Sequence, residues 1–469
     1  MVNVIEDLQF STEYAADEEN HIFYKHSDID YEERGLGYHF YKYMQQHSNL
    51  VAQYIADKEQ EDTYHQVLER CIRTALHLSS RNLTRDDIIV ICSTNNQFTV
   101  VPFIASLFLN VPVATLDPTL SCLDFDYLLK EVKPKVIFII PEVVEMVETS
   151  LQNAGIITEI ILIGKSDVYT EFSSFLEPHP DEETFEPKLV ENVFDTAVIL
   201  FSSGTTGLPK GIMISHYALM AQAAVTILSN NINKIYLSYA SLYWITRVMF
   251  LVATYQIGAA NVMVSKFDPQ ECWLLLDKYK VTNLFLPPSG AISLIKAGRP
   301  DNIDTSNLLT FVTGGAILPQ EYILELRDLL PGAFIYQAYG QTEISGAGNW
   351  FDVNDVKQIL YLHNKPNSVG LPIPNVMCKI LVNHPAVSQV VVIGKPHDED
   401  GDHPMAVIIP NESYLEVIDE DDVINFVEER VPDRMKLRGG IKIVNSFPMT
   451  PSGKIKRVLL KKMILNGEI

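Results

Sequence analysis

Thr196–Gly211 has the sequence TAVILFSSGTTGLPKG, an apolar run followed by hydroxyl residues, glycines and a lysine. The apolar part, Thr196–Leu200, is typical of a buried strand. Small residues after a strand let the backbone approach an anion, and free N–H groups and hydroxyls donate hydrogen bonds to its oxygens. Lys210 adds a compact positive charge. The stretch therefore predicts a phosphate-binding loop that begins where a strand ends.

The candidate phosphate contacts are the hydroxyl residues, the glycines and the lysine of this loop: Ser202, Ser203, Gly204, Thr205, Thr206, Gly207 and Lys210. A Walker A loop has four residues between its first glycine and its Gly-Lys pair, and this loop does not. The spacing therefore disfavours a P-loop kinase or ATPase. The alternative without function is a flexible turn between two strands, and the order of hydroxyls, glycines and lysine directly after a strand argues against it.

Composition sets the broad class of the protein. The chain has 469 residues, enough for two or three domains, and its 47% hydrophobic and 20% charged residues are ordinary for a globular protein. The net charge of −23 argues against nucleic acid as a partner, because an acidic surface repels polyanions. No apolar run approaches 18 residues, so no transmembrane helix is expected.

Cysteine spacing and the chain ends bear on localisation. The five cysteines are widely separated and form no CxxC pair, so we expect reduced thiols in an intracellular protein. The first residues lack the features of a signal peptide. The last residues, Asn466–Ile469, are not the Ser-Lys-Leu peroxisomal signal, which leaves a cytoplasmic or a peroxisomal location open.

Strands and helices are expected to alternate through most of the chain, which predicts the α/β class with layered, mostly parallel sheets. The acidic, proline-containing residues 165–195 are expected to form a surface loop. The predicted strands are Ile88–Cys92, Val111–Leu116, Lys135–Ile140, Ile160–Ile163, Thr196–Leu200, Thr282–Leu286 and Leu309–Val312. The predicted helices are Gly37–Asp57, 62–79, Phe98–Phe108, Asp124–Val132 and His216–Leu228.

The end of the chain differs in character and predicts a small α+β domain. Its expected helix is Asp421–Arg430, with Asp421 or Asp422 as the N-cap. Its expected strands are Val390–Ile393, Met405–Ile409 and Ile441–Val444. We therefore predict an N-terminal domain over residues 1–380 and a C-terminal domain over 381–469.

Two further segments suit a nucleotide. Gly314-Gly315-Ala316 follows an apolar strand, and two glycines allow a flat ring to lie against the backbone; for this segment alone, a tight packing turn is the favoured alternative. In Tyr339-Gly340-Gln341-Thr342-Glu343, the tyrosine ring is suited to stack on a purine and the threonine hydroxyl to donate to a phosphate. The Glu343 carboxylate is suited to hold Mg²⁺, which takes oxygen ligands. A polar loop at a strand end is the alternative.

A third segment, Thr450–Ile455, has the sequence TPSGKI. A Ser-Gly turn followed by Lys454 is suited to deliver an ammonium group to an anionic centre. Where a carboxylate meets a phosphate, negative charge accumulates, and a lysine there stabilises the transition state more than the ground state. The alternative is an exposed turn lysine, which occurs in any protein.

Taken together, these segments resemble the motifs of the adenylate-forming superfamily, which includes acyl-CoA synthetases, 4-coumarate–CoA ligases and beetle luciferases. The resemblance implies an AMP-forming acid–CoA ligase, most similar to insect luciferase-like and 4-coumarate–CoA ligase-like acyl-CoA synthetases. Its substrates would be ATP, CoA and a carboxylic acid, preferably a medium- or long-chain fatty acid, with Mg²⁺ at Glu343. It assigns the glycine segment, Tyr339 and Gly340 to the nucleotide and Lys210, Thr342, Glu343 and Lys454 to catalysis.

The chain departs from the family pattern in two places. Relatives carry a histidine where Trp244 stands, and we assign Tyr243 and Trp244 to the acyl pocket, with core packing as the slightly favoured alternative for Trp244. Leu381 follows Ile380 directly, whereas relatives have several tens of residues there. Those residues complete a small barrel and supply a ribose-binding Gly-Asp and a hinge. A truncated barrel and a missing hinge make a non-catalytic or impaired relative the alternative function.

Overall fold

The computed structural model of the chain describes residues 15–17, 22–24, 31–203, 209–230, 234–372, 378–379, 386–397, 401–411, 414, 419–428, 437–449 and 457–468. These residues form two compact units. One unit holds Asp28–Ser202 and Pro209–Leu371, and the other holds Ser203 and the described residues within 1–27 and 372–469. The predicted boundary between 380 and 381 lies outside the described residues, so it stays a prediction.

The first sheet of the larger unit has the strand order β11-β10-β6-β5-β7-β8-β9. Its strands pair in parallel from β10 through β9. All four residues of β5, β6 and β7 are buried, as expected when helices cover both faces of a parallel sheet. The bounds are β5 Ile89–Cys92, β6 Val113–Leu116, β7 Val136–Ile139, β8 Glu159–Leu162, β9 Thr170–Glu171, β10 Thr196–Ser203 and β11 Pro209–Ser215.

The second sheet has the order β18-β17-β16-β15-β14-β12-β13-β3-β4. Its central strands are parallel, and the hairpins β3–β4 and β16–β17 are antiparallel. The bounds are β3 Val51–Ile55, β4 Gln60–Thr63, β12 Ile235–Ser238, β13 Ala260–Met263, β14 Asn283–Leu286, β15 Thr310–Gly314, β16 Phe334–Gln341, β17 Gly346–Trp350 and β18 Leu371–Pro372.

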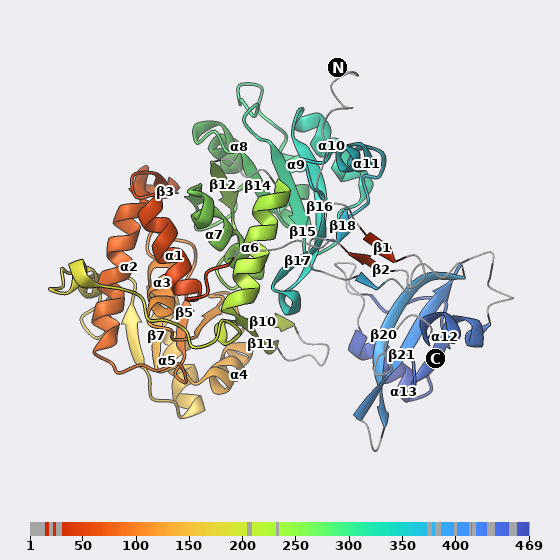
Figure 1. Cartoon of the computed structure of the whole chain (residues 1–469), viewed down its shortest axis with the longest axis horizontal. Helices are drawn as coiled ribbons and strands as arrows, with labels where there is room; N and C mark the ends of the chain where they lie inside the picture. The colour runs from red at the N-terminus through yellow and green to blue at the C-terminus, as the bar shows by residue number, and fades with distance from the viewer. Residues whose placement is uncertain are drawn as a thin grey trace. The chain divides into compact units, whose positions relative to one another are not determined.

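Helices cover both sheets in layers (Figure 1). Helices α4 and α5 pack on one face of the first sheet, and α8, α9 and α10 pack on one face of the second. A third group, α1, α2, α3, α6 and α7, forms the core between the sheets. The helices are α1 Leu36–Gln46, α2 Tyr64–Ser79, α3 Val100–Phe108, α4 Cys122–Val132, α5 Val144–Ala154, α6 His216–Asn230, α7 Ile245–Ile257, α8 Pro269–Lys278, α9 Pro288–Ala297, α10 Gln320–Leu329 and α11 Val356–Asn364.

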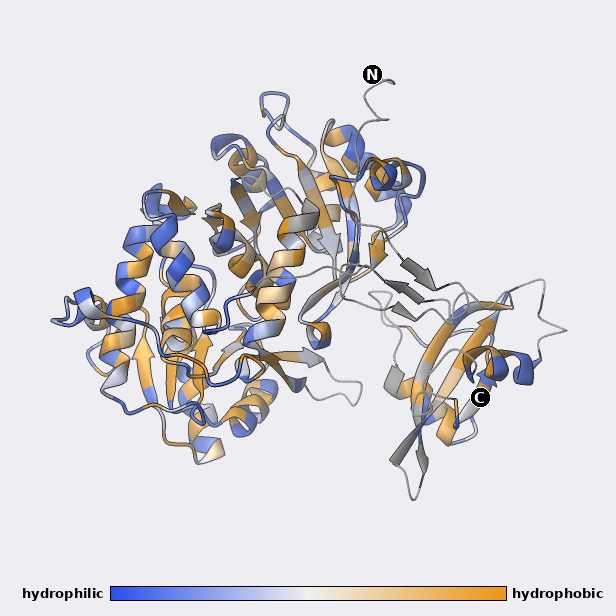
Figure 2. Cartoon of the chain, in the orientation of Figure 1, coloured by the Kyte–Doolittle hydropathy of each residue, from blue (hydrophilic) through white to orange (hydrophobic). Residues whose placement is uncertain are grey.

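Hydrophobic residues concentrate on the sheet strands, whereas the outward faces of α1 and α2 are hydrophilic (Figure 2). The predicted α/β class with layered, mostly parallel sheets is confirmed. Within the described residues, no helix is both long enough and apolar enough to cross a bilayer. Cys71, Cys92, Cys122 and Cys272 are free thiols, as the cysteine spacing predicts.

The smaller unit contains a sheet of order β20-β21-β22 with helices α12 and α13. Strands β20 and β21 are antiparallel, and β22 joins β21 in parallel. Its mixture of strands and helices confirms the predicted small α+β domain. The bounds are β20 Val387–His397, β21 Gly401–Pro410, α12 Glu420–Glu428, β22 Gly440–Ile443 and α13 Arg457–Leu465. A separate sheet in the same unit joins β1 Ala15–Asp17, β2 Ile22–Tyr24 and β19 Cys378–Lys379.

Three local predictions were wrong in whole or in part. The helix expected over Gly37–Asp57 ends at Gln46, because the residues after it form β3, which pairs with β13 at the sheet edge. The loop over 165–195 carries Phe172 and Phe175, whose rings pack into the core. The oxygen that caps α12 belongs to Asp419, which accepts a hydrogen bond from the backbone N–H of Asp421 at 3.0 Å.

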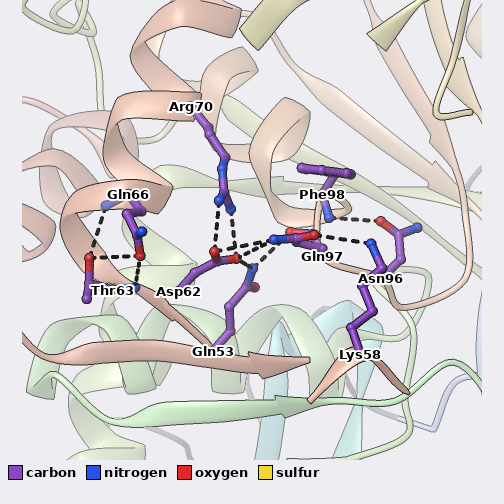
Figure 3. A network of polar contacts seen from close by, with 9 residues as sticks. All are labelled: Gln53, Lys58, Asp62, Thr63, Gln66, Arg70, Asn96, Gln97 and Phe98. Carbon is purple, nitrogen blue, oxygen red and sulfur yellow. Dashed lines mark hydrogen bonds and ion pairs between the residues drawn. The ribbon is translucent and has the colours of Figure 1, made fainter. Parts of the chain in front are cut away.

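A buried ion pair joins the elements around the two sheets (Figure 3). The Asp62 carboxylate on β4 accepts hydrogen bonds from Arg70 on α2 at 2.7 and 2.8 Å, and from Gln53 on β3 at 2.8 Å. Gln97, which follows β5 of the first sheet, donates to the same carboxylate at 3.2 Å. Burial raises the pKa of Asp62, but the hydrogen bonds from Arg70 and Gln53 outweigh it and hold the pKa below its usual value.

Replacing Arg70 by alanine should lower the free energy of unfolding by about 3–5 kcal/mol, because the Asp62 charge would remain buried without its partner. Urea denaturation near neutral pH measures this loss. The matched control is Glu191→Ala, which removes the exposed partner of Arg85 and should change stability far less. Equal losses in the two variants would show that the network in Figure 3 does not hold the fold together.

Two buried histidines lie in the first turns of α1 and α6. His39 lies on α1, and burial lowers its pKa to about 4. His216 begins α6, and its Nδ1 accepts a hydrogen bond from the backbone N–H of Leu36 at 3.2 Å. Burial lowers the pKa of His216 to about 4 as well. Both side chains are therefore neutral in the folded protein at neutral pH.

Stability should fall as the pH drops from about 6.5 to about 4, because the unfolded chain binds protons at these histidines before the folded chain does. His39→Phe removes one of the two titrations. The stability difference between about pH 7.5 and about pH 5 should then shrink by on the order of 1–3 kcal/mol. Urea denaturation at the two pH values measures this difference. A difference as large as that of wild type would show that His39 does not contribute to the pH dependence of stability.

Candidate active site

The phosphate-loop strand and the tyrosine motif meet in the structure. Ser202 lies at the end of β10 in the first sheet, and Glu343 lies in the short 3-10 helix Thr342–Ile344 that follows β16 in the second. The Ser202 hydroxyl donates a hydrogen bond to Glu343 Oε1 at 3.0 Å. Two candidate residues 141 positions apart in sequence are thus brought into contact, and both side chains remain accessible to solvent.

Other predicted phosphate contacts are placed only in part. Lys210 lies on β11 and is exposed. Ser203 is the last residue of β10, but its side chain lies outside the described part of the chain. Gly204, Thr205, Thr206 and Gly207 lie outside the described residues, as does Lys454. Their predicted roles therefore stay predictions.

The two predicted adenine-binding segments lie on neighbouring strands. Gly314 ends β15 and pairs in parallel with Ala338 on β16, the residue before Tyr339. A Cβ atom on Gly314 would lie 3.1 Å from the Ala338 carbonyl oxygen, so the close approach of the strands favours glycine there. Gly315 has a φ of +88°, which also favours glycine, and the half-buried Ala316 follows it. Tyr339 is 45% exposed, so much of its side chain is accessible for stacking.

A glutamine that the sequence analysis did not single out supports the Glu343 segment. Gln222 on α6 donates through Nε2 to the backbone oxygens of Ile344 at 3.1 Å and Ala347 at 2.9 Å. These two carbonyls flank the turn that follows Glu343. No local sequence signal marks Gln222, because a single glutamine on a helix acquires this role only from the way that α6 packs.

The predicted acyl-pocket residues form an aromatic cluster beside β10. The Tyr243 and Trp244 rings meet edge to face with centroids 5.3 Å apart. Tyr243 also stacks on Phe201, the residue before Ser202, at 6.5 Å. Trp244 is 56% exposed, so it is not a core residue as the packing alternative supposed. The cluster therefore places two predicted pocket residues next to the phosphate-loop strand.

The residues at Glu343 fit a magnesium ion. The Ser202 hydroxyl and the Glu343 carboxylate offer oxygen ligands, which Mg²⁺ prefers. Among the described residues, no ion pair occupies Glu343 and no cluster of three or more His, Cys, Asp or Glu side chains is suited to a metal. A magnesium ion at Glu343 would therefore take its other ligands from water and from the phosphates of a nucleotide.

Comparison with known families agrees with this arrangement. Residues 40–393 match the model of the AMP-binding enzyme family, and residues 379–454 match the model of the AMP-binding enzyme C-terminal domain. The chain belongs to the AMP-binding enzyme family. The adenylate-forming superfamily recognised from its motifs is therefore confirmed.

Individual relatives of this AMP-binding enzyme include ligases and a luciferase-like protein. The chain is 24% identical to 4-coumarate–CoA ligase-like 9 of Arabidopsis thaliana, over 86% of this chain and 85% of the relative. It is 24% identical to the long-chain-fatty-acid–CoA ligase of Bacillus subtilis, over 67% and 60%. Its structure is similar to that of the luciferase-like enzyme from the nonluminescent Zophobas morio mealworm, with 30% identity, a TM-score of 0.72, and coverage of 75% and 82%.

Gly340→Ala should lower stability by about 1–3 kcal/mol and shift the Tyr339 segment, since a Cβ there would lie 2.4 Å from the Gly346 backbone oxygen. Thermal unfolding measures the first effect. The control is Gly290→Ala in α9, whose Cβ would approach no atom closer than 3.5 Å and should be neutral or stabilising. A Gly340→Ala variant as stable as wild type would contradict the close approach of β16 and β17.

Proposed function

We propose that this AMP-binding enzyme is an AMP-forming acid–CoA ligase. In the first step, a carboxylate oxygen of the acid attacks the α-phosphorus of ATP, the bond to pyrophosphate breaks, and an acyl-adenylate forms. In the second step, the thiol of CoA attacks the acyl carbon, AMP leaves, and the thiol proton passes to solvent. A medium- or long-chain fatty acid is the proposed substrate, a preference that the fatty-acid ligase relative supports.

The contact between Ser202 and Glu343 carries this proposal. A hydroxyl that donates to a carboxylate fixes where the carboxylate points, and here it does so at the end of the phosphate-loop strand. Bound Mg²⁺ would neutralise phosphate charge at this carboxylate. In the proposed site, Lys210 and Thr342 would contact phosphate oxygens, and Tyr339 and the Gly314–Ala316 segment would bind the adenine.

Lys454 is the proposed adenylating lysine, in the proposed C-terminal domain over residues 381–469. Its ammonium group would stabilise the charge that builds up between the acid and the α-phosphate. The aromatic pair of Tyr243 and Trp244 would form one wall of the acyl pocket. We propose a cytoplasmic or peroxisomal location.

A non-catalytic or impaired relative that binds nucleotide or acyl ligand is the second candidate. The direct connection of Ile380 to Leu381 favours it, because the ribose-binding and hinge segments would be missing. The match to the Arabidopsis relative supports an omission somewhere in this chain: the alignment spans 491 positions, more than the 469 residues of the chain, although it covers only 86% of the chain. Without a hinge, a C-terminal domain would have difficulty moving between two reaction poses.

Pyrophosphate release from ATP with a panel of fatty and aromatic acids separates the two candidates. An active ligase should release pyrophosphate, and Lys454→Ala should slow that release about 100- to 1,000-fold while ATP binding survives. The matched control is Lys462→Ala, which removes the same charge from an exposed position on α13 and should keep the activity.

Thioester formation with CoA is measured in the same reactions. Release together with thioester would show that the shortened chain performs both steps. Release without thioester would place the defect in the second step. No release with any acid, from folded protein that binds ATP, would favour the non-catalytic candidate.

A further inference from the structure

One arginine in the larger unit is buried without a negatively charged partner. Arg247 lies in the first turn of α7 and is 3% exposed. Its Nη1 donates to Asn261 Oδ1 at 2.7 Å, and its Nη2 donates to the sulfur of Met263 at 3.2 Å. Its Nε has no partner. Both of its contacts are neutral, and a thioether sulfur is a weak acceptor.

Arg70, in contrast, has a charged partner. Arg70 is also largely buried, but Asp62 matches its charge with two hydrogen bonds. No ion pair of the described residues involves Arg247. Burial lowers its pKa to about 10, so the guanidinium keeps its charge at neutral pH. An uncompensated buried charge is costly, and a bound anion would remove that cost.

Arg247 lies at the edge of the sheet where the candidate site is built. Met263 is the last residue of β13, which runs parallel to β12, β14, β15 and β16. The carboxyl ends of these strands therefore share one edge, and ligands of open α/β sheets bind at that edge. Gly314 and Tyr339 stand at the ends of β15 and β16.

Helix α7 also connects Arg247 to the predicted acyl pocket. Trp244 immediately precedes α7, and its backbone oxygen accepts a hydrogen bond from the Arg247 N–H at 2.9 Å. On another face of the helix, Met249 approaches Gly346, where a Cβ would lie 2.7 Å from the methionine sulfur. Gly346 begins β17, directly after the segment of Glu343. The N-terminus of α7 adds its own partial positive charge to that of Arg247.

We propose that Arg247 is a specificity-determining residue that pairs with a second anionic group at the far end of the acyl substrate. Resting on the proposed ligase function, this inference makes the preferred acid one with a carboxylate at each end of its chain. A guanidinium binds a carboxylate through two parallel hydrogen bonds. The reacting carboxylate is the less suitable partner, since pairing it with Arg247 would stabilise the ground state and weaken its attack on the phosphorus.

The pairing would occur out of water, because Arg247 has almost no exposed surface. A desolvated charge pair discriminates strongly between partners, since losing one member leaves the other buried and unpaired. The methyl end of a monocarboxylic fatty acid in the same place would not pair with the guanidinium, which would keep only Asn261 and Met263 as partners.

Matched acids test the inference. Octanoate is compared with octanedioate, and decanoate with decanedioate, by kcat/KM for pyrophosphate release from ATP. Wild type should prefer each diacid. Arg247→Met should lower kcat/KM for the diacids at least about 30-fold and leave the monoacids nearly unchanged, whereas Arg247→Lys should retain part of the preference. A wild type that prefers the monoacids, with Arg247→Met unchanged on both series, would overturn the inference and leave Arg247 a structural residue.

A binding measurement separates this inference from the ligase function. Octanedioate alone should raise the thermal midpoint of wild type and not that of Arg247→Met, or of Arg247→Gln if the methionine variant does not fold. If no acid releases pyrophosphate, the ligase function fails while this shift still tests the pairing. Equal shifts in wild type and variant, or loss of ATP binding in the variant without any acid, would overturn the pairing with the acyl substrate.

Discussion

Parallel strands have to be covered by helices on both faces, and the architecture of the larger unit follows from this constraint. Each crossover returns the chain through a helix, so the carboxyl ends of neighbouring strands collect at one edge. In the second sheet that edge receives Gly314 from β15 and Tyr339 from β16, while Trp244, the residue before α7, follows β12. The Ser202–Glu343 hydrogen bond then joins this edge to the end of β10 in the first sheet.

Arg70 and Arg247 differ in how the charge of the guanidinium is balanced. Arg70 has a carboxylate, and the amides of Gln53 and Gln97 use the remaining oxygen lone pairs of Asp62. That network is complete and joins β3, β4, α2 and the residues after β5 (Figure 3). Arg247 is more deeply buried than Arg70 but has only neutral acceptors. The paired charge of Arg70 is suited to a structural role. The unpaired charge of Arg247, next to a candidate site, is suited to binding an anionic ligand.

Strong local patterns were predictable from the sequence. The apolar runs of β5, β6 and β7 were recognised within a residue or two of their ends, because strands buried on both faces are continuously apolar. Helix α2 was also recognised, and its capping box at Thr63 and Gln66 explains why it begins at Tyr64. The segment after Gln46 was mistaken for helix, since the pairing of β3 with β13 is a contact between residues about 200 positions apart and leaves no local pattern.

For the candidate site, the sequence determined which side chains are available, and the tertiary structure decided which of them meet. Ser202, Tyr339 and Glu343 were named from short motifs, because each motif places a specific chemistry at or just after the end of a strand. The support of Gln222 and the unpaired burial of Arg247 depend on α6 and α7 packing against residues far away in the chain. A hydrogen-bond partner or a missing counter-charge is a property of the packed neighbourhood, so no single-sequence pattern contains it.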